Sequence, residues 1–67
     1  MLVKFGEKVR EGRVKRGLTQ EKLGKIAGMH RTYIGAVERG EKNLTLTNLL
    51  KIAKALKVKI VKLLEDL

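Results

Sequence analysis

The residues from His30 to Tyr33 combine side-chain types that are suited to reading the edge of a nucleic acid base. The guanidinium group of Arg31 matches the O6 and N7 acceptors of guanine as a two-pronged donor. Thr32 offers a hydroxyl to a base edge and a methyl group to thymine. The structural alternative is that Arg31 is a solvated surface charge and that Thr32 only begins a helix. Base recognition therefore requires a helix that presents these residues outward.

Two short apolar patterns of helical period flank a break at Gly28. Counting from Gln20, small Gly24 is fifth and Gly28 ninth, and the branched Ile34 and Val37 are fifteenth and eighteenth. A small residue lets two helices cross closely, glycine accepts the positive φ of a tight turn, and branched residues lock the second helix. This spacing predicts a helix-turn-helix, whose second helix enters the major groove of double-stranded DNA.

The apolar periodicity along the whole chain predicts an all-α fold of five helices in a single domain, residues 1–67. The expected helices are Val3–Arg16, residues 20–27, Met29–Arg39, residues 46–56 and Ile60–Glu65. Glycines in the left-handed conformation are expected to end the first three helices, at Gly17, Gly28 and Gly40. Threonines are expected to cap the second and fourth helices, at Thr19 and Thr45. The residues expected to face the core are Phe5, Val9, Leu23, Ile26, Ala27, Ile34, Val37, Leu46, Leu49, Leu50, Ala53, Leu56, Leu63 and Leu64.

Composition narrows the classes of function. The chain has 67 residues, with 16 Lys and Arg against 7 Asp and Glu, for a net charge of +9. This excess on a small surface favours a polyanionic partner, either nucleic acid or an anionic membrane. No cysteine is present, which excludes disulfides and thiolate chemistry and is compatible with the cytoplasm. Charged residues interrupt the apolar residues at the start of the chain, which argues against a membrane span there. Aromatic residues are sparse, which argues against a membrane-surface peptide.

The segments GLTQEKLGKIAG, RTYIGAVERG and LLKIAKAL resemble the lambdoid repressor and Cro-like family, also called the xenobiotic response element family. The resemblance runs from about Phe5 to Leu64. Within it, RTYI followed by ERGEKNLTL is most similar to the controller proteins of restriction-modification systems, which are small dimeric regulators of their own operons. The resemblance implies a compact five-helix, repressor-like DNA-binding domain.

The resemblance also assigns roles to single residues. It places Gln20 at a helix N-terminus that binds phosphate, and makes Tyr33 a phosphate or base contact unless its ring packs over the second helix. Ala36 offers a methyl to thymine on the exposed face or merely fills space, and His30 caps a helix or contacts phosphate. The complete set of expected DNA-binding residues is Thr19, Gln20, His30, Arg31, Thr32, Tyr33, Ala36, Arg39, Lys42 and Asn43.

Arg13 and Glu38 match positions that pair across the first and third helices in these repressors, so we expect both to be structural, as we do Gly24 and Gly28. Departures from the family pattern occur elsewhere. Gly12 replaces a large apolar residue, for which Val14 is expected to compensate. Lys57 and Lys59 stand where a glycine and a capping serine are usual, which predicts a strained turn before the fifth helix.

Near the C-terminus, Val61 and Leu67 lack an evident inner partner, and such a patch predicts a homodimer formed through the C-terminal region. Two copies would bind a roughly palindromic operator. The function predicted is therefore a sequence-specific transcriptional regulator with no cofactor, no metal site and no small-molecule ligand. The alternative is an antitoxin-like module of a toxin-antitoxin pair, whose main partner is a protein. An enzyme is disfavoured, because no nucleophile, base and orienting group occur as a set.

Overall fold

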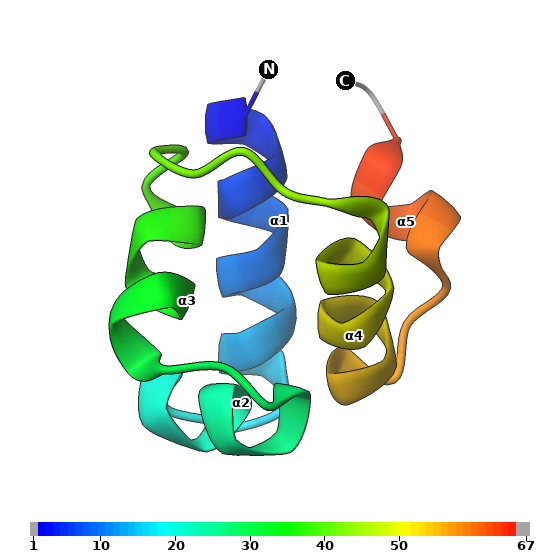
Figure 1. The fold of residues 1–67 in the computed structure, drawn as a ribbon. Coiled ribbons are helices and arrows are strands. Elements are labelled where there is room, and N and C mark those ends of the chain that lie inside the picture. The colour runs from blue at the N-terminus through cyan, green and yellow to red at the C-terminus, as the bar shows by residue number, and fades with distance from the viewer. Residues whose placement is uncertain (1, 66–67) are drawn as a thin grey trace.

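The computed structural model describes residues 2–65, which form five α-helices and no strand (Figure 1). The helices are α1 (Leu2–Lys15), α2 (Gln20–Ala27), α3 (Arg31–Glu38), α4 (Leu46–Leu56) and α5 (Ile60–Leu64). The predicted all-α, five-helix fold is confirmed. The second and fourth helices occupy the residues expected, whereas α3 begins two residues later than predicted, because Met29 and His30 belong to the turn.

α1 runs through the middle of the bundle, with α3 along one side and α4 and α5 along the other (Figure 1). α2 closes one end, where it packs against both α3 and α4. The long segment between α3 and α4 crosses the opposite end, near the start of α1 and the end of α5. The start of α3 therefore lies at the α2 end of the bundle.

The core between these helices is aliphatic. Its largest fully buried side chains are Leu23, Ile34, Ile52, Leu56, Val9 and Val37. Four residues predicted to face inward are exposed instead, namely Ile26, Leu46, Leu50 and Leu64, with exposed fractions between 43% and 68%. On α4 the inner face runs through Leu49, Ile52, Ala53 and Leu56, at the three- and four-residue spacing of one helix stripe. Leu46 and Leu50 lie outside that stripe.

Local capping interactions define the helix ends as the sequence predicts. The hydroxyl of Thr19 accepts from the backbone N–H of Lys22 at 3.0 Å, and Thr45 accepts from Asn48 at 3.1 Å. Each bond satisfies an N–H that has no partner within its helix. Gly28 ends α2 in the left-handed region with φ of 73°. The turn therefore reverses the chain without steric cost to a side chain.

The turn between α4 and α5 is the strained one that the sequence predicts. Lys57 adopts a left-handed conformation with φ of 57°, a region that disfavours residues with a Cβ. Lys59 begins α5 without a side-chain capping bond. By contrast, the expected compensation for Gly12 by Val14 is wrong, because Val14 is exposed. Leu56 occupies that space, and a Cβ on Gly12 would lie 3.3 Å from its Cδ1.

Candidate nucleic-acid interface

The crossing of α2 and α3 depends on Gly24. A Cβ built at this position would lie 2.4 Å from the carbonyl oxygen of Met29, which is closer than real Cβ contacts occur. The backbone N–H of Met29 also donates to the carbonyl of Gly24 at 2.7 Å. The backbones therefore touch directly, and the direction of α3 is fixed by contacts that do not depend on a flexible side chain.

A buried ion pair holds α3 against α1. Arg13 donates from Nε to Glu38 Oε2 at 2.6 Å and from Nη2 to Oε1 at 3.1 Å, so the guanidinium group grips the carboxylate at two points. Its Nη1 donates to the carbonyl oxygen of Leu18 at 2.8 Å. The side chain of Glu38 is only 4% exposed. The predicted structural pairing is present, and it ties α1, the turn before α2 and the end of α3 together.

Gln20 joins this pair from the first turn of α2. Its Nε2 donates to Glu38 Oε1 at 3.1 Å, an interaction that the sequence did not reveal. An amide nitrogen carries two hydrogens, so one remains for another acceptor. The side chain thus links the buried carboxylate to the surface on which a phosphate contact was expected.

His30 caps α3, as predicted. Its Nδ1 accepts from the backbone N–H of Thr32 at 3.1 Å and lies 2.8 Å from the hydroxyl of Thr32. A neutral imidazole that accepts at Nδ1 carries its proton on Nε2, which leaves an N–H donor on an exposed ring. The cap therefore orients both side chains at the start of the helix.

Arg31 is exposed at the same helix start. Its side chain is 64% exposed, and Nη1 lies 4.0 Å from Glu21 Oε2 on α2. Such an exposed pair is weak, so the guanidinium group is available to other acceptors. Arg31 and Thr32 form, with the capping His30, an exposed cluster of polar side chains that we call the recognition edge.

Ala36 does not belong to this exposed surface. It is only 7% exposed, and it lies within a run of five consecutive buried residues, 34–38. The second turn of α3 is enclosed because α1 packs on it from one side and α2 from another. The prediction that the Ala36 methyl lies on an exposed face is therefore wrong, and exposure on α3 is confined to its first turn.

Tyr33 lies at the boundary between these two turns. It is partly buried and packs against the core, and its hydroxyl accepts from Nδ2 of Asn48 on α4 at 3.2 Å. The hydroxyl thus links α3 to α4, a contact that the sequence did not reveal. Its role in binding DNA stays a prediction.

Arg39, the C-cap of α3, folds back over Gly35, and a Cβ on Gly35 would lie 3.2 Å from Arg39 Nη1 and 3.4 Å from Gln20 Oε1. Arg39 Nε also lies 3.1 Å from Glu41 Oε2. The hydrogen bond to Glu41 and the charge of that carboxylate raise the pKa of Arg39. Gly35 thus leaves room for Gln20 and Arg39 to approach each other. Gly35 was not singled out from the sequence, although it lies four residues, about one helical turn, before Arg39.

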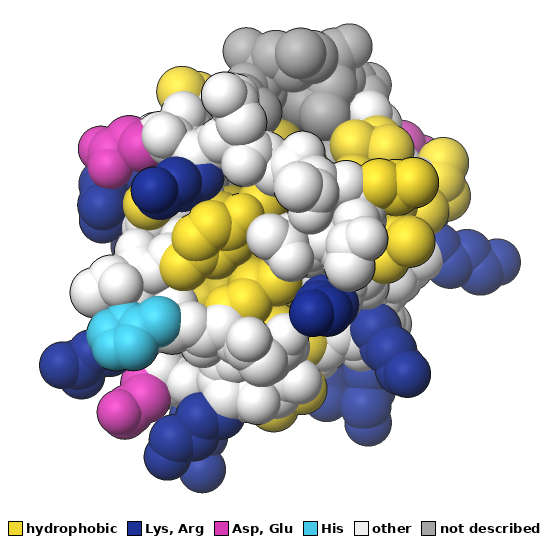
Figure 2. All heavy atoms as spheres, viewed as in Figure 1, with side chains coloured by type: hydrophobic (Ala, Val, Ile, Leu, Met, Phe, Trp, Pro, Cys, Tyr) yellow, Lys and Arg dark blue, Asp and Glu magenta, His cyan; other side chains and the backbone are white. Residues whose placement is uncertain are grey.

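The remaining predicted contacts, Lys42 and Asn43, are exposed in the segment after α3. α3 has eight residues and is therefore about 12 Å long, and these two residues follow its far end, whereas the recognition edge lies at its start. Lys and Arg side chains also surround the face drawn in Figure 2. The arrangement suits an extended polyanion that passes along α3.

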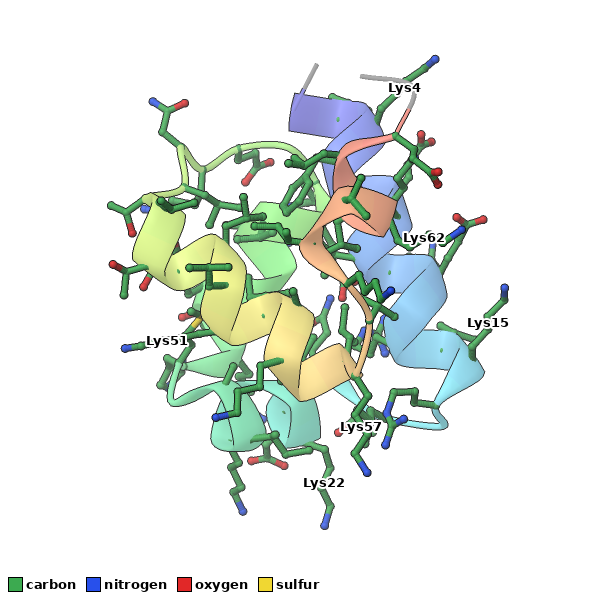
Figure 3. The ribbon with its side chains drawn as sticks, turned by 90° about the vertical axis from the view of Figure 1, so that its right-hand side faces the viewer. Lys4, Lys15, Lys22, Lys51, Lys57 and Lys62 are labelled. Atoms are coloured by element: carbon green, nitrogen blue, oxygen red, sulfur yellow. The ribbon has the colours of Figure 1, made fainter. Side chains whose placement is uncertain are left out.

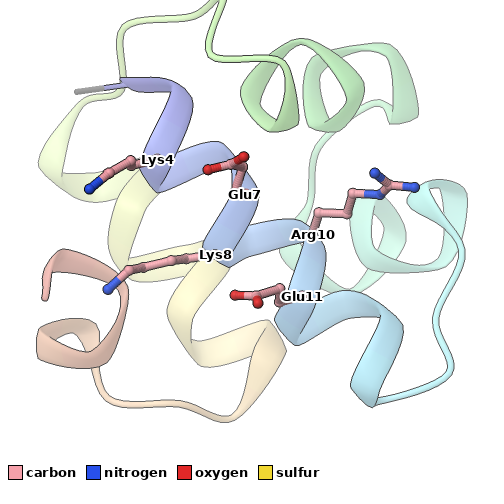
Figure 4. A pocket seen from close by; sticks show the side chains of 5 residues that line it. All are labelled: Lys4, Glu7, Lys8, Arg10 and Glu11. Atoms are coloured by element: carbon pink, nitrogen blue, oxygen red, sulfur yellow. The ribbon is translucent and has the colours of Figure 1, made fainter. Parts of the chain in front are cut away.

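Positive charge is not confined to this face. The labelled lysines in Figure 3 extend from several helices, and a shallow hollow of about 480 Å³ on α1 is lined by Lys4, Glu7, Lys8, Arg10 and Glu11 (Figure 4). Two glutamates lie among the three basic residues of that hollow, so it offers no uniform potential to a polyanion. Lys8 donates to the backbone carbonyls of Lys62 and Glu65, which ties α1 to the end of α5.

Residues 2–65 contain neither a metal-binding cluster nor a membrane-spanning helix. No cluster of three or more His, Cys, Asp or Glu side chains is placed to hold a metal ion there. Over the same residues, no helix combines the length and the hydrophobicity that crossing a bilayer requires.

Comparison with known proteins identifies similar sequences and folds. Residues 9–63 match the helix-turn-helix family model HTH_3. Control protein C.SmaI from Serratia marcescens is 53% identical over 60 residues, which cover 90% of this chain and 71% of that protein. The restriction-modification controller protein C.AhdI from Aeromonas hydrophila superimposes with a TM-score of 0.90 at 48% identity, over 92% of this chain and 94% of that one. The DNA-binding domain of the P22 c2 repressor superimposes with a TM-score of 0.88 at 35% identity, over 92% and 82%.

Proposed function

Because the chain belongs to the helix-turn-helix family and matches a control protein over most of both lengths, we propose that it is a transcriptional regulator that binds double-stranded DNA. The observation that carries this proposal is the exposed recognition edge at the start of α3, held by the direct backbone contact between Gly24 and Met29. A rigid helix start with exposed polar groups is what a major groove about 12 Å wide accommodates.

Base reading is assigned to Arg31 and Thr32. The guanidinium group of Arg31 is exposed, and within residues 2–65 its one ion pair is the weak contact to Glu21. Binding a guanine therefore exchanges one acceptor for two better-aligned ones. Thr32 is held by the His30 cap, which limits its rotation. Because Ala36 is buried, we assign readout to the first turn of α3 alone.

Contacts to the phosphate backbone are assigned to the residues around that edge. Gln20 retains one amide hydrogen beyond its bond to Glu38, and His30 retains its Nε2 donor. The other residues assigned to the backbone are Thr19, Tyr33, Arg39, Lys42 and Asn43. Such contacts fix the register of the protein on DNA and make affinity fall with salt, but they carry little sequence information.

We assign the dimer interface to the outer faces of α4 and α5. The large exposed hydrophobic residues of these two helices are Leu46, Leu50, Val61 and Leu64, and Figure 2 shows hydrophobic side chains gathered over this region. Leu67, the other residue of the predicted patch, lies outside the described residues. Two-fold pairing would place two recognition edges about 34–36 Å apart, as a roughly palindromic operator requires.

We further propose that the protein acts in the cytoplasm.

The direct test is selection of bound sites from a random DNA pool, followed by affinity measurements on selected and random duplexes at one salt concentration. We expect a two-fold related consensus and at least about a thousandfold preference for it. Equal affinity for all duplexes would refute sequence-specific regulation.

A second measurement addresses the dimer. In sedimentation, the wild type should be a dimer. The double variant Leu50→Ser, Val61→Ser should be a monomer. If the double variant remained dimeric, the interface would lie outside α4 and α5.

A further inference from the structure

A second hollow lies between α2 and α4, on a part of the surface that the proposed DNA contacts do not use. Its volume is about 500 Å³, and it is lined by Lys25, Ile26, Ala27, Gly28, Lys51, Lys54 and Ala55. We call it the α2–α4 groove. Ala27 and Ala55 are each 6% exposed, so with Gly28 they form a floor of small residues.

Ile26 is the feature of this groove that neither the fold nor DNA binding explains. Its pattern predicts an inward position, yet its side chain is 57% exposed, because α2 meets its neighbours through Leu23, Gly24 and Ala27. An exposed branched side chain beside a concave surface gains free energy when another apolar group covers it.

The charge in the groove has one sign. Lys25, Lys51 and Lys54 are exposed around the apolar floor, and none of the seven lining residues is acidic. The hollow on α1 contrasts with this, because two glutamates interrupt its three basic residues. A ligand that satisfies both features of the groove carries negative charge and an apolar side chain together.

Nucleic acid fits these features poorly. A phosphate backbone has no aliphatic group to place against Ile26, and the groove has no aromatic side chain on which a base could stack. A lipid surface also fits poorly, because the lining has no aromatic anchor and Ile26 is its one large aliphatic side chain. A protein segment supplies both carboxylates and an aliphatic side chain.

We propose that the α2–α4 groove binds an acidic segment of a partner protein through one aliphatic anchor residue. The anchor covers Ile26 over the floor of Ala27, Gly28 and Ala55, and the flanking carboxylates meet the three lysines. Lys25 also lines the hollow that contains His30 and Arg31, so the bound segment lies beside the recognition edge. The groove thereby gives the regulator a protein-binding surface next to its DNA-binding one.

The test uses two fluorescent peptides and the full chain. One peptide has a single central leucine flanked by aspartates, and in the other the leucine is serine. We expect the leucine peptide to bind roughly tenfold more tightly, since it buries aliphatic surface. Its binding should shift the amide resonances of residues 25–28 and 51–55. Ile26→Ser should abolish the preference between the peptides.

Charge variants separate the groove from net charge. Lys51→Gln with Lys54→Gln should weaken both peptides by about two- to fivefold, because exposed charge pairs contribute little each. Lys4→Gln with Arg10→Gln removes the same charge from α1 and should change affinity by less than about twofold. All variants alter exposed side chains, and thermal melts check that they fold.

Three results would overturn the proposal. Equal losses in the two charge variants would mean that attraction is nonspecific. Amide shifts confined to residues 30–32 would mean that the peptide mimics DNA at the recognition edge. A change in the sedimentation of Ile26→Ser without peptide would mean that the groove is an interface between copies of this chain.

Discussion

Helices α1–α3 and helices α4–α5 differ in how much freedom their contacts allow. In the first region a buried carboxylate is gripped at two points by Arg13, and Gly24 meets the backbone of Met29 without room for a methyl group. In the second region the turn places Lys57 in a left-handed conformation, and α5 begins without a side-chain cap.

This difference follows from what each region has to position. The start of α3 must be held within a fraction of an ångström if its side chains are to bind base edges, so its supports are backbone contacts and a buried ion pair. α4 closes the core and is linked to α3 by the bond from Asn48 to Tyr33, whereas α5 packs on α1 and α4. We therefore expect the missing cap of α5 to cost stability with little effect on the recognition edge.

The largest effect is expected from Glu38→Ala. It leaves the guanidinium group of Arg13, which is 13% exposed, without its partner, and breaking a buried pair in this way costs about 3–5 kcal/mol. Urea unfolding followed by circular dichroism measures the loss. Glu11→Ala, which removes an exposed glutamate from α1, should stay within about 0.5 kcal/mol of the wild type. Similar losses in the two variants would show that the pair does not anchor α3.

Gly24→Ala tests the backbone contact between α2 and α3. The added methyl group collides with the carbonyl of Met29, so we expect a loss of about 1–3 kcal/mol in the free energy of unfolding. Gly35→Ala is the matched control within a helix, because its methyl meets side-chain atoms of Arg39 and Gln20 at 3.2 and 3.4 Å and not a backbone atom. That control should be neutral or gain up to about 1 kcal/mol from helix propensity. The reverse order would contradict the assigned contact.

Arg31→Ala separates base reading from phosphate binding. It should cost about 1–3 kcal/mol of DNA affinity and relax the preference at one base position, whereas Lys42→Ala should weaken all duplexes similarly and reduce the salt slope by about one. Titrations of the selected duplex and of single-base variants at several salt concentrations measure both effects. A uniform loss with Arg31→Ala would place that residue on the phosphates.

Lys57→Gly tests the less constrained region. Removing the side chain relieves the left-handed conformation, so stability should rise by about 1 kcal/mol in thermal or urea unfolding. The same substitution three residues earlier, Lys54→Gly in the exposed face of α4, should lower stability by about 1 kcal/mol. The diagnostic result is that the same Lys→Gly substitution raises stability at position 57 and lowers it at position 54.

Features set by local sequence were predicted well. The threonine caps and the left-handed glycines depend on residues within one turn of each other, and the structure contains them where expected. Capping also explains the error at the start of α3. The apolar pattern extends to Met29, but His30 accepts from Thr32 as an N-cap, so the helix begins after it.

Features set by contact between distant residues were not predicted from the pattern. Ile26 and Leu50 are apolar at helical spacing, and periodicity alone does not say where the partner helices stop. Gly6 was overlooked for the same reason. A Cβ there would lie 2.4 Å from the carbonyl of Val37, which shows how closely α1 and α3 approach, yet nothing around Gly6 in the sequence marks the approach.

The candidate site shows the same division. The placement of His30, Arg31 and Thr32 at an exposed helix start was predictable, because a glycine turn and a helix cap mark it locally. The bond from Gln20 to Glu38, and the bond from Asn48 to Tyr33, connect residues 15 or more positions apart, and only the folded chain reveals them. Ala36 was misjudged because the burial of the second turn depends on α1 and α2 together.

The enclosure of residues 34–38 has a consequence for how such a regulator changes over time. In the proposed function, base reading is limited to the first turn of α3, and residues 34–38 belong to the core. On that proposal, we expect replacements at positions 31 and 32 to change the preferred operator without loosening the domain. Two regulators of this type could then differ in their target after few mutations.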